Sequence, residues 1–154
     1  MEPLSISLVA FAVTLVVGTV AIHSVGTFFL LWGTVKYRDR ISDRSRFISL
    51  TGGVTIRVLA LLLLHLLEVA LWAVLFYKEG CFPDLRTSVY FSLVTYSTVG
   101  YGDVVLNGQY RMLGGIEALV GVLMLSWTTA LLIGYLQRAY SPLLDRWRGP
   151  RRDN

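Results

Sequence analysis

The chain has 154 residues, of which 55% are hydrophobic, and its mean hydropathy of +0.61 is too high for an ordinary soluble domain of this length. The formal net charge is +4, and the basic residues flank the apolar segments. This composition indicates a membrane protein and makes nucleic-acid binding a poor explanation of the positive charge.

Three apolar segments are long enough to cross a bilayer, because a helix needs ~20 residues to span the hydrocarbon core. They cover residues 4–35, 58–77 and 112–137. The first segment has no formal charge, no basic residue precedes it, and it is too long for a cleaved signal peptide. The expected fold class is therefore an all-α membrane protein with three transmembrane helices.

The basic residues predict the orientation of the chain in the cell (plasma or inner) membrane. Residues 36–57 carry Lys36, Arg38, Arg40, Arg44, Arg46 and Arg57, the C-terminal segment carries Arg138, Arg146, Arg148, Arg151 and Arg152, and the opposite side has Lys78, Arg86 and Arg111. The positive-inside rule places residues 36–57 and 138–154 in the cytoplasm, with the N-terminus and residues 78–111 outside. Anionic lipid headgroups are the expected partners of the basic segments.

Residues 92–103 read Ser-Leu-Val-Thr-Tyr-Ser-Thr-Val-Gly-Tyr-Gly-Asp, and the string from Thr98 to Gly102 matches the potassium-channel selectivity filter. Rings of main-chain carbonyls can cage a dehydrated cation if successive residues alternate between right- and left-handed backbone. Gly100 and Gly102 enter the left-handed region without a side-chain penalty. We expect Thr98 to add a hydroxyl oxygen at the inner end, and Val99 and Tyr101 to point outward into a packed collar.

A glycine-rich turn between two helices is the simpler alternative for this string. Its position between two apolar segments, after a helix-length stretch and before an acidic residue, favours the filter. The helix-length stretch follows the breakers Gly80 and Pro83, so Asp84 is the expected N-cap of a pore helix that ends near Tyr96. The negative end of its dipole would then favour a cation at the membrane centre.

Residues 54–138 resemble the pore module of potassium channels, with outer helix, pore helix, filter and inner helix in that order. In detail they are similar to small bacterial channels of the ion-channel family that have one additional N-terminal helix. We therefore divide the chain into an N-terminal transmembrane helix (1–35), a basic cytoplasmic loop (36–53), the pore domain (54–138) and a short basic cytoplasmic tail (139–154).

The resemblance implies a role for each residue of the pore. It assigns K+ coordination to Thr98, Val99, Gly100 and Tyr101 with Gly102 completing the filter, the outer mouth to Asp103, a gating glycine to Gly121, and the central cavity to Val122, Leu125 and Thr129. Gly121 has two explanations that stay open, a hinge in the inner helix or close packing against the pore helix.

The resemblance also implies a homotetramer, because one chain supplies one quarter of a filter ring. It implies passive permeation of K+ without catalysis, and no cofactor or small-molecule substrate is evident. The chain departs from the family pattern at Tyr90 and Phe91, where many members have a tryptophan pair, and at Val94, where some bacterial channels have a glutamate.

Four other residues are unusual for a membrane segment. His65, Glu68 and Trp72 share one face of the second segment, and Glu117 lies near the start of the third. Ionisable groups such as His65, Glu68 and Glu117 are costly in a membrane, so each is either functional or a buried group that holds helices together. A metal site at His65 and Glu68 lacks an evident third ligand. The first segment has Gly18, Gly26 and Gly33 for close packing and lacks the arginine ladder of a voltage sensor.

Three other functions compete with a potassium channel. A subunit of a potassium-uptake transporter usually has degenerate filters in four fused repeats, whereas this chain has the full string once. A membrane enzyme is poorly supported, because the sequence has no zinc-protease, serine-hydrolase or phosphate-loop motif. A non-selective cation pore is disfavoured by Tyr101 in the filter.

Overall fold

A computed structural model describes residues 6–37 and 46–148 of the chain. Every regular element in this part is helical. The elements are α1 (Ile6–Tyr37), α2 (Arg46–Lys78), α3 (Leu85–Tyr96), the short 3-10 turn η3 (Gly108–Tyr110) and α4 (Arg111–Arg148). The predicted all-α fold class is confirmed.

Three of these helices are long and apolar enough to cross a membrane, as the hydropathy pattern predicts. The qualifying stretches are Leu8–Gly33, Thr51–Lys78 and Arg111–Ser141. The helices themselves are longer than the apolar runs, since α2 begins at Arg46 within the predicted loop and α4 continues to Arg148 within the predicted tail. Hydropathy underestimates helix length because backbone hydrogen bonding propagates beyond the residues that face lipid.

Several basic residues used for the orientation have no described side chain. Arg38, Arg40, Arg44, Arg151 and Arg152 lie outside the described residues, which do not include any part of the segment between α1 and α2 (residues 38–45). Arg57 is described, and its guanidinium lies 4.2 Å above the ring of Tyr135, which joins α2 to α4 at the end remote from α3.

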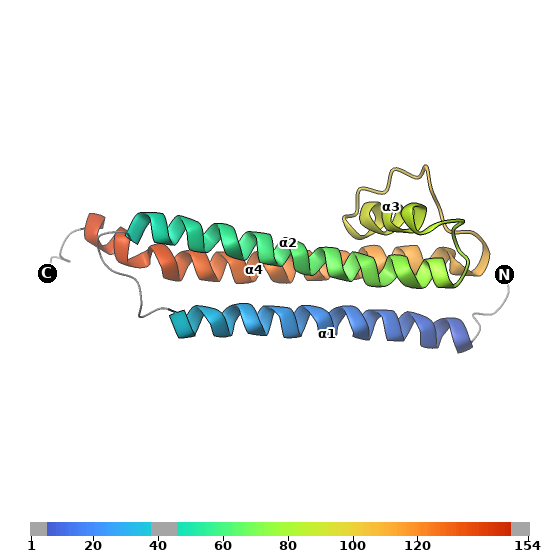
Figure 1. The fold of residues 1–154 in the computed structure, drawn as a ribbon, viewed down its shortest axis with the longest axis horizontal. Coiled ribbons are helices and arrows are strands. Elements are labelled where there is room, and N and C mark those ends of the chain that lie inside the picture. Colours follow the sequence, from blue (N-terminus) through green and yellow to red (C-terminus); the bar gives the residue numbers. More distant parts are fainter. Residues whose placement is uncertain (1–5, 38–45, 149–154) are drawn as a thin grey trace, which may run out of the picture.

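The three long helices run side by side, and α3 with its loop lies at one end of the bundle (Figure 1). In this view α1 lies on one side of the α2–α4 pair and α3 on the other. The start of α1 is at the same end as α3, and the end of α4 is at the opposite end. The N-terminal end of α1 and the pore loop therefore lie toward the same end of the bundle.

Aromatic side chains hold α3 against the bundle. Phe76 of α2 packs edge-on against Phe82 and Phe91, with ring centroids 6.4 and 5.6 Å apart, and Trp72 packs against Phe76. Leu8 and Leu15 of α1 belong to the same buried cluster. The core therefore includes all four helices at the end that carries α3.

Close approach between α1 and α2 depends on small residues of α1. A Cβ added at Gly26 would overlap the Leu64 side chain, and one at Gly18 would lie 3.2 Å from Leu71. At Gly33 nothing lies within 4 Å of the added Cβ, so the packing role predicted for these glycines applies to Gly26 and Gly18. Trp72 also donates a 2.9 Å hydrogen bond across this interface to the Thr19 hydroxyl.

Candidate functional site

The pore loop begins with a capped helix. Asp84 has extended backbone (φ −149°, ψ 159°) and accepts hydrogen bonds from the Thr87 amide at 2.8 Å and the Thr87 hydroxyl at 2.9 Å. These two bonds to the carboxylate lower the pKa of Asp84. The N-cap and the end of α3 at Tyr96 are both as predicted.

The filter string has positive φ at every second residue. The φ values are 62° at Thr98, 56° at Gly100 and 75° at Gly102, and Val99 and Tyr101 between them are not in this region. This is the alternation that turns successive carbonyls toward one axis. The two glycines were predicted in this conformation, whereas Thr98 was not, although counting back two residues from Gly100 would have found it.

Main-chain hydrogen bonds tie the string to the end of α3. The Gly100 amide donates to the Val94 carbonyl at 3.2 Å, and the Thr98 amide donates to the Thr95 carbonyl at 2.9 Å. These bonds fix the inner half of the string relative to the pore helix. Thr98, with a side-chain cost of ~1–2 kcal/mol in left-handed backbone, is therefore held by its neighbours.

The outer half of the string is tied to α3 by one side-chain bond. The Tyr90 hydroxyl donates to Asp103 Oδ2 at 2.6 Å. This bond to a carboxylate, with the nearby negative charge, raises the pKa of Tyr90. Tyr90 therefore clamps the residue that follows the filter.

The predicted collar around the filter is not formed within one chain. The side chains of Val99 and Tyr101 are 52% and 72% exposed. Apolar side chains can face lipid at little cost in free energy. The Tyr101 hydroxyl, in contrast, needs a hydrogen-bond partner that lipid tails do not offer. A packed collar at these positions needs groups from outside this chain.

Gly121 is buried and packs against the last residue of the pore helix. A Cβ at this position would overlap the Tyr96 carbonyl oxygen and would lie 2.9 Å from the carbonyl carbon. This contact is between backbones, so no side-chain rotation relieves it. Of the two explanations for Gly121, the geometry supports close packing.

The other inner-helix candidates lie on the exposed surface of the single chain. Val122 and Leu125 are among the exposed large apolar residues, and the Thr129 hydroxyl donates to the Leu125 carbonyl at 2.8 Å. A single chain therefore leaves all three positions uncovered.

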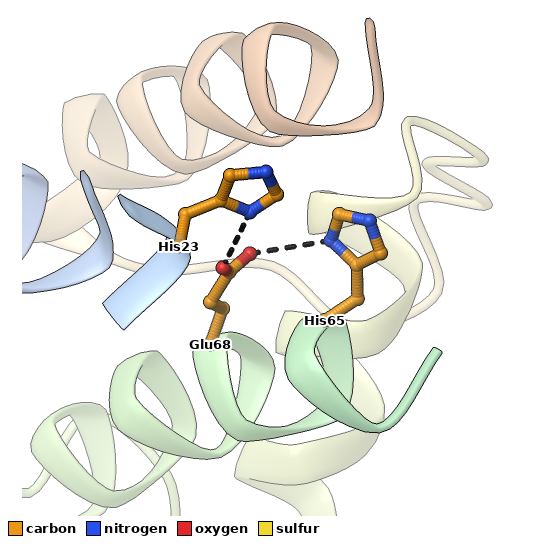
Figure 2. Close-up of side chains that lie close together, drawn as sticks. All are labelled: His23, His65 and Glu68. Carbon is orange, nitrogen blue, oxygen red and sulfur yellow. Dashed lines mark hydrogen bonds and ion pairs between the residues drawn. The ribbon is translucent and has the colours of Figure 1, made fainter. Parts of the chain in front are cut away.

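A polar cluster lies between the helices, and Figure 2 shows its three central side chains. His23 Nδ1 is 2.8 Å from one carboxylate oxygen of Glu68, and His65 Nδ1 is 3.2 Å from the other. The Tyr96 hydroxyl donates to Glu68 and lies 3.1 Å from His65 Nδ1. His23 and Glu68 are fully buried, and the side chain of His65 is 11% exposed.

The sequence predicted that His65 and Glu68 share one face of the second segment but missed the rest of this cluster. His23 comes from α1, and Thr128 of α4 lies 2.9 Å from His65 Nε2 and 3.5 Å from His23 Nε2. His23 is the one ionisable residue of the first apolar segment, and that rarity was the available signal. The expectation that no third metal ligand lies nearby is therefore wrong.

Glu117 is fully buried, and neither of its carboxyl oxygens has a hydrogen-bond partner among the described residues. The same is true of the Ser92 hydroxyl on α3. An ionised carboxylate without a partner would be very costly at such a site. Glu117 also lies close enough to Tyr96 to act on it electrostatically, so this carboxyl is next to the histidine cluster.

Comparison with known proteins places the pore loop in a family. Residues 64–138 match the model of a family described as ion channel, a region that includes much of α2, all of α3, the filter string and most of α4. No curated protein and no solved structure matches the chain. This region is a potassium-channel-like pore module, and with the three apolar helices it indicates a multi-pass membrane protein.

Proposed function

We propose that this protein is a potassium-selective channel that conducts K+ passively through the filter formed by residues 98–102. The observation that carries the proposal is positive φ at every second residue of the string. An ordinary glycine-rich turn does not require left-handed backbone at a threonine, where it is unfavourable. A column of inward-facing carbonyls requires it, because the conformation has to alternate along the string. No catalytic step and no cofactor is part of the proposal.

In the proposed mechanism, four chains each contribute one string around a common axis. The main-chain carbonyls of Thr98, Val99, Gly100 and Tyr101, with the Thr98 hydroxyl, replace the hydration shell of K+. The negative dipole end of each α3 favours a cation below the filter. Asp103, held by Tyr90, adds negative charge at the outer mouth.

The exposed side chains beside the filter support the homotetramer. Val99 and Tyr101 have no cover in one chain, and a ring of neighbouring chains would bury them in the collar. Val122, Leu125 and Thr129 would line the cavity below the filter in the same assembly. Because each chain has one string and the channels that it resembles have a four-fold filter ring, the proposed pore needs four chains.

The proposed orientation follows the positive-inside rule in the cell membrane. It places the N-terminus and the filter outside, with the C-terminus and most basic residues in the cytoplasm beside anionic lipid. The position of the start of α1 at the same end as α3 supports this relative placement.

Reversal potentials of purified protein in planar bilayers test the selectivity. With a tenfold K+ gradient, and Na+ making the total cation concentration equal on both sides, a K+-selective pore should reverse at ~59 mV in magnitude, toward the K+ equilibrium potential. A non-selective cation pore with this string would reverse near zero, because its Na+ permeability would cancel most of the gradient. A reversal near zero would therefore replace the proposal with that second candidate.

A further inference from the structure

We propose that His23, His65 and Glu68 bind a divalent first-row transition metal ion such as Zn2+, and that the Tyr96 hydroxyl oxygen is the fourth ligand. The site lies between the helices and apart from the filter string. Metal binding here does not depend on which ion the pore conducts, so the proposal stands separately from potassium selectivity.

The spacing of the candidate ligand atoms fits a small tetrahedral site. Ligands ~2.0–2.1 Å from Zn2+ lie ~3.3 Å from one another at tetrahedral angles. Contacts of 2.8 and 3.2 Å join the two histidines to Glu68, and a contact of 3.1 Å joins His65 to Tyr96, whose hydroxyl also contacts Glu68. One ligand atom from each of His23, His65 and Glu68 lies within 4.8 Å of the other two, so the widest of these pairs has to close by ~1.5 Å or less.

Both imidazoles have the same orientation toward the rest of the site. Each presents Nδ1 to the Glu68 carboxylate (Figure 2) and Nε2 to the Thr128 hydroxyl oxygen. Metal-bound imidazoles usually donate their remaining N–H to an oxygen, and a hydroxyl oxygen has two lone pairs to receive them. When both rings carry hydrogen on Nε2, both Nδ1 lone pairs face the carboxylate, and a cation between them resolves the repulsion.

The charge of the site also favours a cation. The Glu68 carboxylate is fully buried, and its recorded ion-pair partners in the described part of the chain are the two histidines. With neutral imidazoles the cluster has a charge of −1 in a low-dielectric interior, where an uncompensated charge is costly. A divalent ion between these ligands offsets this charge.

The ligands come from separate elements, so an ion would crosslink them. His23 is on α1, His65 and Glu68 are on α2, and Tyr96 is the last residue of α3, two positions before Thr98. Bound metal would therefore fix the first helix to the base of the pore helix. This predicts that Zn2+ raises the melting temperature of the protein as well as binding to it.

Cobalt absorption of the purified full-length chain, stripped with a chelator, tests the site directly. Co2+ added in steps should give visible bands of a tetrahedral centre that saturate at one ion per chain, and Zn2+ should bleach them. His23→Gln and Glu68→Gln should lose the bands, and Thr128→Val should bind Co2+ ~10–100-fold more weakly.

Thr19→Ala is the matched control, because it removes a hydrogen bond between α1 and α2 without removing a ligand. It should keep the cobalt bands and the Zn2+-dependent rise in melting temperature. Wild-type protein without bands at one ion per chain, or His23→Gln protein that keeps them, would overturn the proposal. The cluster would then be a hydrogen-bonded network that holds the helices together.

Discussion

At the scale of single residues, the backbone conformation of the pore loop follows from residue types that can be read in the sequence. Gly100 and Gly102 lie where left-handed backbone is needed, and Asp84 caps α3. Thr98 was harder to predict, because its conformation is imposed by hydrogen bonds to α3 and not by its own preference. Contacts between residues distant in sequence, such as His23 with Glu68, were not predictable from spacing.

Gly121→Ala tests the packing role of the inner-helix glycine. The added methyl group would overlap the Tyr96 carbonyl, so we expect overpacking to cost ~1–3 kcal/mol per chain and to lower the melting temperature. Gly134→Ala is the control on the same helix, since nothing lies within 4 Å of a Cβ there, and it should be neutral or slightly stabilising. A stable Gly121→Ala protein with reduced open probability would instead support a hinge.

At the scale of elements, the three spans and the pore helix were predicted from hydropathy and capping signals. The ends of α2 and α4 were not, because helices continue beyond the apolar runs that identify them. The place of α1 was also not predictable, since its packing depends on which glycines meet which side chains. At Gly26 the absence of a side chain leaves room for Leu64 of α2, whereas Gly33 makes no such contact.

Acid should weaken α3 through its N-cap. The pKa of Asp84 is lowered in the folded chain, so its contribution to stability is complete above the unfolded value of ~3.9 and is lost as pH falls through the lower folded value. Asp84→Asn keeps a capping oxygen and should remove this acid dependence, whereas Asp84→Ala should be less stable at neutral pH. Melting temperatures from pH 2 to pH 7 measure both, and an unchanged acid profile in Asp84→Asn would contradict the assignment.

At the scale of the whole molecule, one chain leaves the filter side chains uncovered and places the start of α1 beside the pore loop. The sequence predicts the assembly only through the resemblance, because no pattern within a single chain encodes contacts made by its copies. The orientation likewise depends on how the basic residues are distributed along the sequence.

Labelling from outside the cell tests the orientation. The native Cys81 is a poor probe, because it packs against the buried core cluster and burial raises its pKa, which lowers the reactive thiolate fraction. A cysteine at exposed Asn107 in a Cys81→Ser chain should react with a membrane-impermeant maleimide in intact cells. One at Thr51, near the opposite end of the bundle, should react only after the cells are permeabilised.

The central claim is that the string at residues 98–102 selects K+ through its backbone, and Gly100→Ala tests it most directly. A side chain at φ 56° costs ~1–2 kcal/mol in each chain and would disturb the carbonyl column. Gly115→Ala is the control, since that glycine is helical and has nothing within 4 Å of an added Cβ. In bilayer recordings of both variants, we predict that Gly100→Ala loses K+ over Na+ selectivity although it reaches the membrane, and that Gly115→Ala keeps it. Unchanged selectivity in Gly100→Ala would contradict the account.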